Sequence, residues 1–253
     1  MLTEERLQEI WRIVKEKGSV STQELMDTLD ISESTARRDL TALDEQGLLQ
    51  KVRGGAMMKS DNFNTKEDTV LQKKDKNLED KRRIARYAAS LIKEDDFVYL
   101  DAGTTTELVI DYLTEKRVTF VTNAVSHARK LSQAGYTTYI LGGEFKATTE
   151  AIVGDEAVKS LQKYNFTKGF WGTNGVHQKA GFCTPDVKEA EVKKTAMKHC
   201  AERFVLSDPS KFSQISCVKF GEFANACIIT TQVPDELYKQ CKNIIEVQGG
   251  EKK

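Results

Sequence analysis

The chain has 253 residues, 39% of them apolar, and its 38 basic and 38 acidic side chains cancel. This length accommodates one small module plus one domain with its own core, and the even spread of apolar residues excludes global disorder. No apolar run approaches the roughly 18–20 residues of a membrane span, so we expect no membrane association. The zero net charge gives no support to nucleic-acid binding, which would need locally concentrated positive charge.

The cysteines and histidines are few and far apart. The chain has five cysteines without a Cys-x-x-Cys spacing and three distant histidines, which predict neither a disulfide framework nor a metal site. The first residues lack the basic and apolar segments of a signal peptide. We therefore expect a cytoplasmic chain with reduced thiols, no metal and no cofactor.

Residues 1–58 have the pattern of three short helices followed by a hairpin. Apolar residues at i, i+3, i+4 and i+7 indicate one buried helical face over residues 3–17. Ser21 and Glu24 form a capping box that begins a second helix. Ser32 is the expected N-cap of a third helix, and a short strand with a basic Gly-Gly turn follows it.

Three helices with a tight turn between the second and third are typical of a helix-turn-helix, whose third helix enters the DNA major groove. Guanidinium groups can form paired hydrogen bonds to guanine or phosphate, and an arginine on the glycine turn would reach a phosphate or the minor groove. The candidate DNA-binding residues are Ser32, Ser34, Thr35, Arg37, Arg38 and Arg53. The alternative is that the two adjacent arginines solvate an exposed face and pair with Glu33 or Asp44.

Residues 59–75 are polar and rich in Lys, Asp and Asn, which predicts a solvated linker leading into a helix. The alternative is that part of the cluster at 73–76 contacts a DNA backbone.

From about residue 84 onward, expected strands alternate with expected helices. The expected strands are 97–100, 118–122, 137–141, 169–172, 204–207, 226–230 and 244–247. The expected helices are 105–113, 126–134, 155–164, 187–199 and 235–241. This alternation predicts a largely parallel sheet covered on both faces, in which ligands bind at the carboxyl ends of the strands.

The most informative stretch is residues 99–108, where an apolar strand runs through a short loop into a helix. Helix N-termini attract anions, Gly103 lets the backbone approach closely, and Thr104, Thr105 and Thr106 add hydroxyl donors, so we expect a phosphate there. The alternative is that Thr104 only caps the helix. Asp101 at the strand tip could bind sugar hydroxyls or equally brace the loop.

Other strand ends are also small and polar, including Thr122-Asn123, Gly142-Gly143 and residues 172–175. They could be ordinary turns, but their corresponding positions suggest one shared pocket. Lys211 follows a further strand and could give a cation to a phosphate or be a surface residue. Glu189 opens a charged helix.

Both halves of the chain resemble the DeoR family of bacterial repressors. In the first half the resemblance lies in residues 31–40, Leu43 and 52–56. In the second half it lies in residues 101–105, 122–123, 142–143, 181–189 and 207–212. The resemblance implies an α/β protein with a winged helix-turn-helix at 1–58, a linker at 59–75 and a Rossmann-like sensor domain at 76–253. That sensor domain is similar to ribose-5-phosphate isomerase and glucosamine-6-phosphate deaminase.

The resemblance implies a role for each site residue, which the spacing of the residues alone does not indicate. The threonine loop and Lys211 would hold the phosphate of a sugar phosphate, while Asp101, Asn123 and Glu189 would face the sugar. Among DeoR-type repressors the chain most resembles those of fructose uptake operons in Gram-positive bacteria, which implies fructose 1-phosphate. Tagatose 6-phosphate or another hexose phosphate is the alternative.

We therefore expect a repressor, not an enzyme, that binds operator DNA and a sugar-phosphate effector. The resemblance implies a dimer or tetramer, and a dimer is also reasonable because one uncharged head would bind DNA poorly. The rival hypothesis is a sugar-phosphate isomerase or deaminase with a DNA-binding extension, for which Asp101, Asp186 and Glu189 are candidate bases. A third hypothesis, an interaction module without ligand, leaves the threonine loop unexplained.

Overall fold

The computed structural model describes all residues except 1–2, 47, 53, 59–62, 66 and 248–253. The chain divides into two compact units, residues 1–62 and residues 63–253, which are described separately.

The first unit is a three-helix domain with a small antiparallel sheet. Its elements are α1 (Thr3–Lys17), β1 (Ser19–Ser21), α2 (Thr22–Leu29), α3 (Glu33–Glu45), β2 (Leu49–Val52) and β3 (Gly55–Met58). The expected N-caps are confirmed, since Ser21 and Ser32 accept hydrogen bonds from the backbone N–H of Glu24 and Thr35. The predicted capping box at Ser21 is formed only in this half among the described contacts, because the Glu24 side chain accepts from Lys17. Sequence reasoning missed β1, which pairs with β3 and completes the sheet. Gly55 is required there because a Cβ atom would lie 2.1 Å from the Val20 carbonyl oxygen.

The core of this unit lies between the three helices and the sheet. Ile10, Val14, Leu25 and Leu40 are at most 1% exposed. The predicted face of α1 is turned toward this core, with Ile10 and Val14 fully buried and Leu7 and Trp11 partly buried against it. The inner face of α3 packs on this core, so its other face is free to meet a partner.

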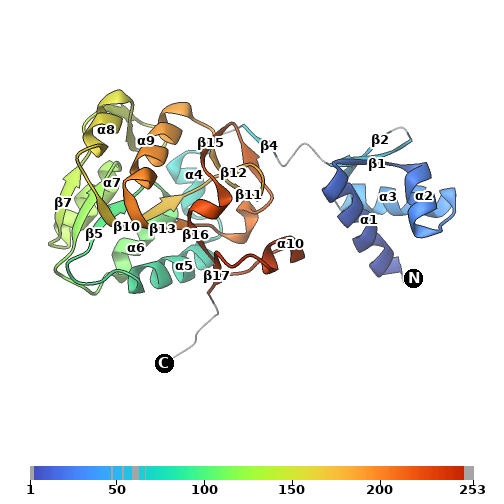
Figure 1. Cartoon of the computed structure of the whole chain (residues 1–253), viewed down its shortest axis with the longest axis horizontal. Coiled ribbons are helices and arrows are strands. Elements are labelled where there is room, and N and C mark those ends of the chain that lie inside the picture. Colours follow the sequence, from blue (N-terminus) through green and yellow to red (C-terminus); the bar gives the residue numbers. More distant parts are fainter. Residues whose placement is uncertain (1–2, 47, 53, 59–62, 66, 248–253) are drawn as a thin grey trace. The chain divides into compact units, whose positions relative to one another are not determined.

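The second unit is built on a parallel sheet of seven strands among the described residues (Figure 1). In spatial order the strands are β17 (Ile244–Glu246), β16 (Cys227–Thr230), β13 (Cys200–Leu206), β10 (Phe166–Gly172), β5 (Phe97–Leu100), β6 (Thr119–Thr122) and β7 (Thr137–Ile140). Each pair of neighbours is parallel. All seven predicted strands are present, with ends that differ by a few residues.

Helices cover both faces of this sheet (Figure 1). On one face lie α5 (Leu78–Ser90), α6 (Thr104–Val109) with the 3-10 turn η2 (Ile110–Tyr112), and α7 (Val125–Gln133). On the other face lie α8 (Asp155–Leu161) and α9 (Val187–Lys198). Successive strand residues alternate between the two cores, as Phe170 and the fully buried Trp171 show. The predicted two-sided sheet is therefore confirmed.

Smaller elements surround the carboxyl ends of the strands and were not predicted. They are the sheet of β11 (Gly175–His177), β12 (Gly181–Thr184) and β15 (Val218–Gly221), the hairpin of β8 (Glu144–Lys146) and β9 (Ala151–Val153), strand β14 (Ile215–Ser216), and the turns η3 (Pro209–Lys211) and η4 (Phe223–Asn225). Helix α10 (Glu236–Lys239) is the core of the helix expected at 235–241. Short strands with mixed polarity give weak periodic signals.

The predicted linker 59–75 needs correction, because the chain from residue 63 onward belongs to the second unit. Strand β4 (Phe63–Asn64) pairs with β14, and helix α4 (Val70–Lys74) begins at a capping box of Thr69 and Gln72. We call residues 63–77 the strap. The strap was not predicted because a two-residue strand and a five-residue helix have little periodicity. The spacing of Thr69 and Gln72 is that of a capping box and was the one local signal in the sequence.

Candidate functional site

The N-terminal end of α3 presents a cluster of small hydroxyls. The Ser32 Oγ accepts from the Thr35 N–H at 3.3 Å and lies 3.0 Å from the Ser34 Oγ and 2.9 Å from the Thr35 Oγ1. Ser32 and Ser34 are exposed and Thr35 is half-buried. The predicted donors are therefore gathered at the start of the helix that would read DNA.

The two arginines of α3 differ in their partners. Both are exposed, and Arg37 forms an ion pair with Glu33 at 2.5 Å, as the alternative interpretation expected. Arg38 makes no ion pair with any described residue, so its guanidinium is available. An exposed ion pair such as Arg37–Glu33 contributes roughly 0–1 kcal/mol to stability, so Arg37 can exchange Glu33 for a phosphate or a base. Arg53 lies outside the described residues.

Sequence reasoning missed the side chains that hold α3 in place. Arg6 of α1 donates to Asp39 of α3 through Nε at 2.5 Å and through Nη2 at 3.2 Å, and both side chains are buried. The Asp39 hydrogen bond raises the pKa of Arg6, although burial acts against it. On the exposed side, the Lys51 Nζ of β2 donates to the Thr41 Oγ1 at 2.6 Å. The sequence shows an aspartate directly after Arg38, but it does not show that this side chain is buried against α1.

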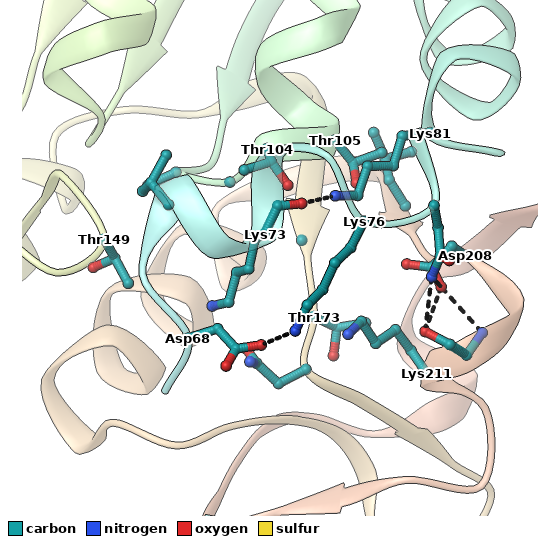
Figure 2. Close-up of a pocket in the computed structure, with 18 of the residues that line it drawn as sticks. Asp68, Lys73, Lys76, Lys81, Thr104, Thr105, Thr149, Thr173, Asp208 and Lys211 are labelled. Atoms are coloured by element: carbon teal, nitrogen blue, oxygen red, sulfur yellow. Dashed lines mark hydrogen bonds and ion pairs between the residues drawn. The ribbon is translucent and has the colours of Figure 1, made fainter. Parts of the chain in front are cut away.

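In the second unit, a cavity of about 320 Å³ opens at the carboxyl ends of the parallel strands (Figure 2). Strand β5 leads to β6 and β7 on one side, and β10 leads to β13 on the other, so the chain order reverses between β5 and β10. Ligands of such sheets bind at this switch point. The lining residues are Asn64, Asp68, Val70, Lys73, Lys76, Asn77, Lys81, Ala102, Gly103, Thr104, Thr105, Thr149, Gly172, Thr173, Asn174, Glu189, Lys193, Leu206, Asp208, Ser210 and Lys211.

Five of the eight predicted ligand-binding residues line this cavity. They are Gly103, Thr104, Thr105, Glu189 and Lys211. Helix α6 has only six residues, and the lysines in the lining add their positive charges to the partial charge at its N-terminus.

Three predicted residues are not in the lining, and they brace the loop from behind. The Thr106 Oγ1 lies 2.7 Å from the Asp101 carbonyl oxygen and 2.8 Å from that of Gly103. The Asn123 Oδ1 accepts from the Ala102 N–H at 2.9 Å and from the Tyr99 hydroxyl at 3.2 Å. Thr106, Asn123 and Asp101 are at most 2% exposed, so we correct their expected direct contact with ligand to a supporting position.

Asp101 forms a buried ion pair with Lys193 of α9. Its Oδ2 also accepts from the Gly172 N–H at 3.1 Å, while Oδ1 has no hydrogen-bond partner among the described atoms. Burial raises the pKa of Asp101, and Lys193 opposes that rise. The pair links β5, β10 and α9 at the floor of the cavity.

The cavity contains five lysines and three carboxylates among the described residues. Lys193 is bound to Asp101, Lys76 pairs with Asp68 at 2.9 Å, and the Lys81 Nζ donates to the Lys73 carbonyl oxygen. Within the described part of the chain, the ammonium groups of Lys73 and Lys211 have no ion-pair or hydrogen-bond partner. An excess of cations with two of them uncommitted is suited to an anionic ligand.

Glu189 of α9 contributes a carboxylate to the lining of the cavity. Its Oε1 accepts from the Thr149 hydroxyl at 2.5 Å and from the Lys146 Nζ at 3.3 Å, and its Oε2 accepts from the Thr184 hydroxyl at 3.2 Å. Burial alone would raise the pKa of Glu189, but the charge of Lys193 and these contacts outweigh it and lower the pKa. An ionised carboxylate in this place can accept hydrogen bonds from ligand hydroxyls.

The wall formed by η3 is tied to the strap. The Asn77 Nδ2 donates to the Asp208 Oδ1 at 2.8 Å and to the Ser210 Oγ at 3.2 Å, and Ser210 donates to Asp208 at 2.5 Å. These contacts fix the turn that carries Lys211 (Figure 2).

His127 of α7 supports the threonine loop and was not predicted. Its Nε2 lies 3.2 Å from the Thr106 Oγ1 and its Nδ1 lies 3.3 Å from the Ser126 Oγ. Since the Thr106 hydroxyl is directed at backbone carbonyls, the ring donates from Nε2 and accepts at Nδ1. Burial lowers the pKa of His127 to about 3, and Lys130 contributes less.

This shift predicts acid sensitivity of the second unit. Below a pH of about 6.5 the unfolded chain binds a proton at this histidine and the folded chain does not, so its stability is full above that pH and is lost as pH falls toward the folded pKa. We expect the His127→Gln substitution to reduce the pH slope of the unfolding free energy by about 1.4 kcal/mol per pH unit between pH 6 and 5. Urea unfolding followed by Trp171 fluorescence, in a Trp11→Phe background, measures the slope, and an unchanged slope would contradict the assignment.

Comparison with known proteins identifies the family. Residues 6–62 match the DeoR-like helix-turn-helix domain, and residues 76–232 match the DeoR C-terminal sensor domain. The uncharacterized HTH-type transcriptional regulator FruR of Bacillus subtilis is 44% identical over 98% of this chain and 99% of its own. The lactose phosphotransferase system repressor of Staphylococcus aureus is 34% identical over 96% of this chain and 98% of its own. The chain belongs to the DeoR family of transcriptional repressors.

Among solved structures, ribose 5-phosphate isomerase A from Neisseria gonorrhoeae has a TM-score of 0.41 and 14% identity, covering 53% of each chain. The delta subunit of eIF2B from Chaetomium thermophilum has a TM-score of 0.39 and 18% identity, covering 59% of this chain and 58% of its own. The predicted architecture, a helix-turn-helix domain followed by a Rossmann-like α/β domain, is confirmed.

None of the described helices has the length and hydropathy of a membrane span. In the same part of the chain, no three His, Cys, Asp or Glu side chains gather as metal ligands.

The residues that sequence reasoning missed are mainly lysines. Lys73, Lys76 and Lys81 lie in and after the strap, and Lys193 lies 92 positions after its partner Asp101. Lys73 and Lys76 were considered only as possible DNA contacts, and the structure places them in the cavity of the second unit. No local pattern could have joined them to the threonine loop.

Proposed function

We propose that this DeoR-family repressor controls an operon for sugar uptake or catabolism, and that a phosphorylated sugar bound in the cavity regulates its binding to operator DNA. The observation that carries the proposal is the cavity, which combines five lysines, Thr104, Thr105 and the carboxylate of Glu189. A phosphate dianion suits the lysines and hydroxyls, and sugar hydroxyls suit the carboxylate. The volume of about 320 Å³ is near the lower end of the usual range of roughly 300–1,000 Å³ for small-molecule sites.

Fructose 1-phosphate is the proposed effector, in keeping with the resemblance to repressors of fructose operons. The S. aureus relative is named a lactose phosphotransferase system repressor, which keeps tagatose 6-phosphate as the alternative. Two copies of the chain would present two DNA-binding heads, so we propose a dimer or tetramer as the acting form.

The rival proposal, a sugar-phosphate isomerase or deaminase, is less well supported. Such chemistry needs a base with a pKa near neutrality. Burial by itself raises the pKa of Asp186 and of Glu189, but their hydrogen bonds and nearby lysines outweigh it, and both pKa values are lowered. Burial raises the pKa of Asp101, but its side chain is fully buried, is paired with Lys193 and is not in the cavity lining. The carboxylates that line the cavity are therefore better suited to bind a ligand than to transfer a proton.

The proposal is tested with the purified full chain and DNA that it selects from a random pool. In a thermal-shift panel, fructose 1-phosphate should raise the melting point more than fructose, because a ligand of the folded state stabilises it. The same sugar phosphate should change the affinity for the selected DNA.

Arg38→Ala, and to a similar degree Arg37→Ala, should weaken binding of that DNA by about 1–3 kcal/mol without altering the thermal shift. Arg12→Ala is the control, because Arg12 lies on α1 and pairs with Glu9 and Glu16. A protein that responds to no sugar phosphate, or whose DNA binding is insensitive to all of them, would refute the proposal.

A further inference from the structure

The strap is held to the second unit mainly by polar contacts. The Ser216 Oγ donates to the Asn64 carbonyl oxygen at 2.6 Å, and the Val70 N–H donates to the Thr148 carbonyl oxygen at 3.1 Å. Helix α4 has no buried residue, and Leu71 is 81% exposed. Segments with few buried apolar contacts open at low free-energy cost, so the docking of the strap is easily shifted.

We call the rest of the second unit, from residue 78 onward, the sensor body. Lys73 extends into the cavity from the strap, and Lys211 extends into it from η3 of the sensor body (Figure 2). Neither ammonium group has an ion-pair or hydrogen-bond partner among the described residues. Partial burial is the main cause of the lowered pKa of Lys73; the charges of Glu189 and Glu67 oppose this shift, and those of Lys193 and Lys211 add to it by smaller amounts. An anion between the two groups would replace this repulsion with two charge-assisted hydrogen bonds.

A second contact joins the strap to the ligand site. The Lys146 Nζ binds Glu67 of the strap at 2.7 Å and Glu189 of the cavity wall at 3.3 Å. A ligand that engages Glu189 therefore acts on the same lysine that anchors the strap.

We propose that the phosphate of the effector binds between Lys73 and Lys211 and thereby fastens the strap to the sensor body. This inference rests on the proposed function and adds its signalling element, because the strap continues directly from residues 1–62. A ligand shifts an equilibrium only by its differential affinity for the two states. Contact with Lys73 provides that difference, since the site is complete only when the strap is docked.

The test uses the full chain, inorganic phosphate as the probe, and four variants: Lys73→Met, Lys211→Met, the control Lys74→Met, and Lys73→Gln. Lys74 is the exposed neighbour on the same helix and lies outside the lining of the cavity. Calorimetry should show roughly 10- to 100-fold weaker phosphate binding in the first two variants and unchanged binding in the control. Lys73→Gln, which keeps a polar side chain, should behave like Lys73→Met.

Hydrogen exchange gives the second readout. Phosphate should slow exchange of the amides at 70–77 in the parent and in Lys74→Met, but not in Lys73→Met. Equal phosphate affinity in Lys73→Met and Lys74→Met, or unchanged exchange of the strap in the parent, would overturn the inference and leave the proposed function standing. A parent that binds neither phosphate nor any sugar phosphate would overturn both.

Discussion

Replacement of Lys193 by Met is expected to destabilise the second unit by about 3–5 kcal/mol, because it leaves the Asp101 carboxylate buried without its counter-ion. Asp101 is 0% exposed, and one of its oxygens already lacks a hydrogen-bond partner among the described atoms. Its remaining strong contact would be the Gly172 N–H. Urea unfolding of the full chain, with hydrogen exchange to separate the two units, measures the loss.

Two further variants separate the charge from the packing. Lys194→Met is the matched control, since Lys194 is an exposed neighbour on α9 and should cost little. The double variant Asp101→Asn with Lys193→Met removes both charges and should recover a large part of the stability. A single Lys193→Met variant as stable as the control would show that the pair is not what holds β5, β10 and α9 together.

Leu40→Ala is expected to remove a large part of the stability of the first unit, and so to raise its unfolded fraction, while the second unit is unaffected. Leu40 is 1% exposed on the inner face of α3, and such truncations cost about 2–5 kcal/mol. A unit of this size has a total stability of only about 3–9 kcal/mol, so the loss removes a large part of it. DNA binding should fall sharply, whereas the thermal shift caused by fructose 1-phosphate should persist.

Leu48→Ala is the control for this substitution, because Leu48 is 37% exposed and less apolar contact is lost. Hydrogen exchange of residues 3–45 reports the folded fraction of the first unit in both variants. If Leu40→Ala protects these amides as well as Leu48→Ala does, the core of the unit is not centred on α3.

The elements with a clear apolar pattern were predictable, and those that depend on tertiary contacts were not. Helix α1 has a periodic apolar face and the strands of the parallel sheet are mostly apolar, so their places followed from the sequence although several strands have only three or four residues. Helix α4 and strand β4 have five and two residues, and they take their shape from contacts with β14 and Thr148. Such tertiary contacts leave no local pattern, so these residues had the composition of a linker.

The candidate site divides in the same way. Gly103, Thr104 and Thr105 were recognised because strand, loop and helix are consecutive in the chain. Thr106 and Asn123 were assigned to the ligand although they support the loop, because residue type does not reveal on which side of a backbone a hydroxyl or amide lies. The lysines of the cavity come from separate elements, and only the folded sheet brings them together.

A cavity lined by five lysines attracts any small dianion, not only a particular sugar phosphate. Free phosphate, in a buffer or in a cell, competes for the same ammonium groups and raises the apparent dissociation constant of the effector. The proposed switch would therefore respond to the ratio of sugar phosphate to inorganic phosphate and not to the sugar phosphate alone. Dissociation constants obtained in phosphate buffer would understate the affinity, and those obtained at different ionic strengths would not be comparable.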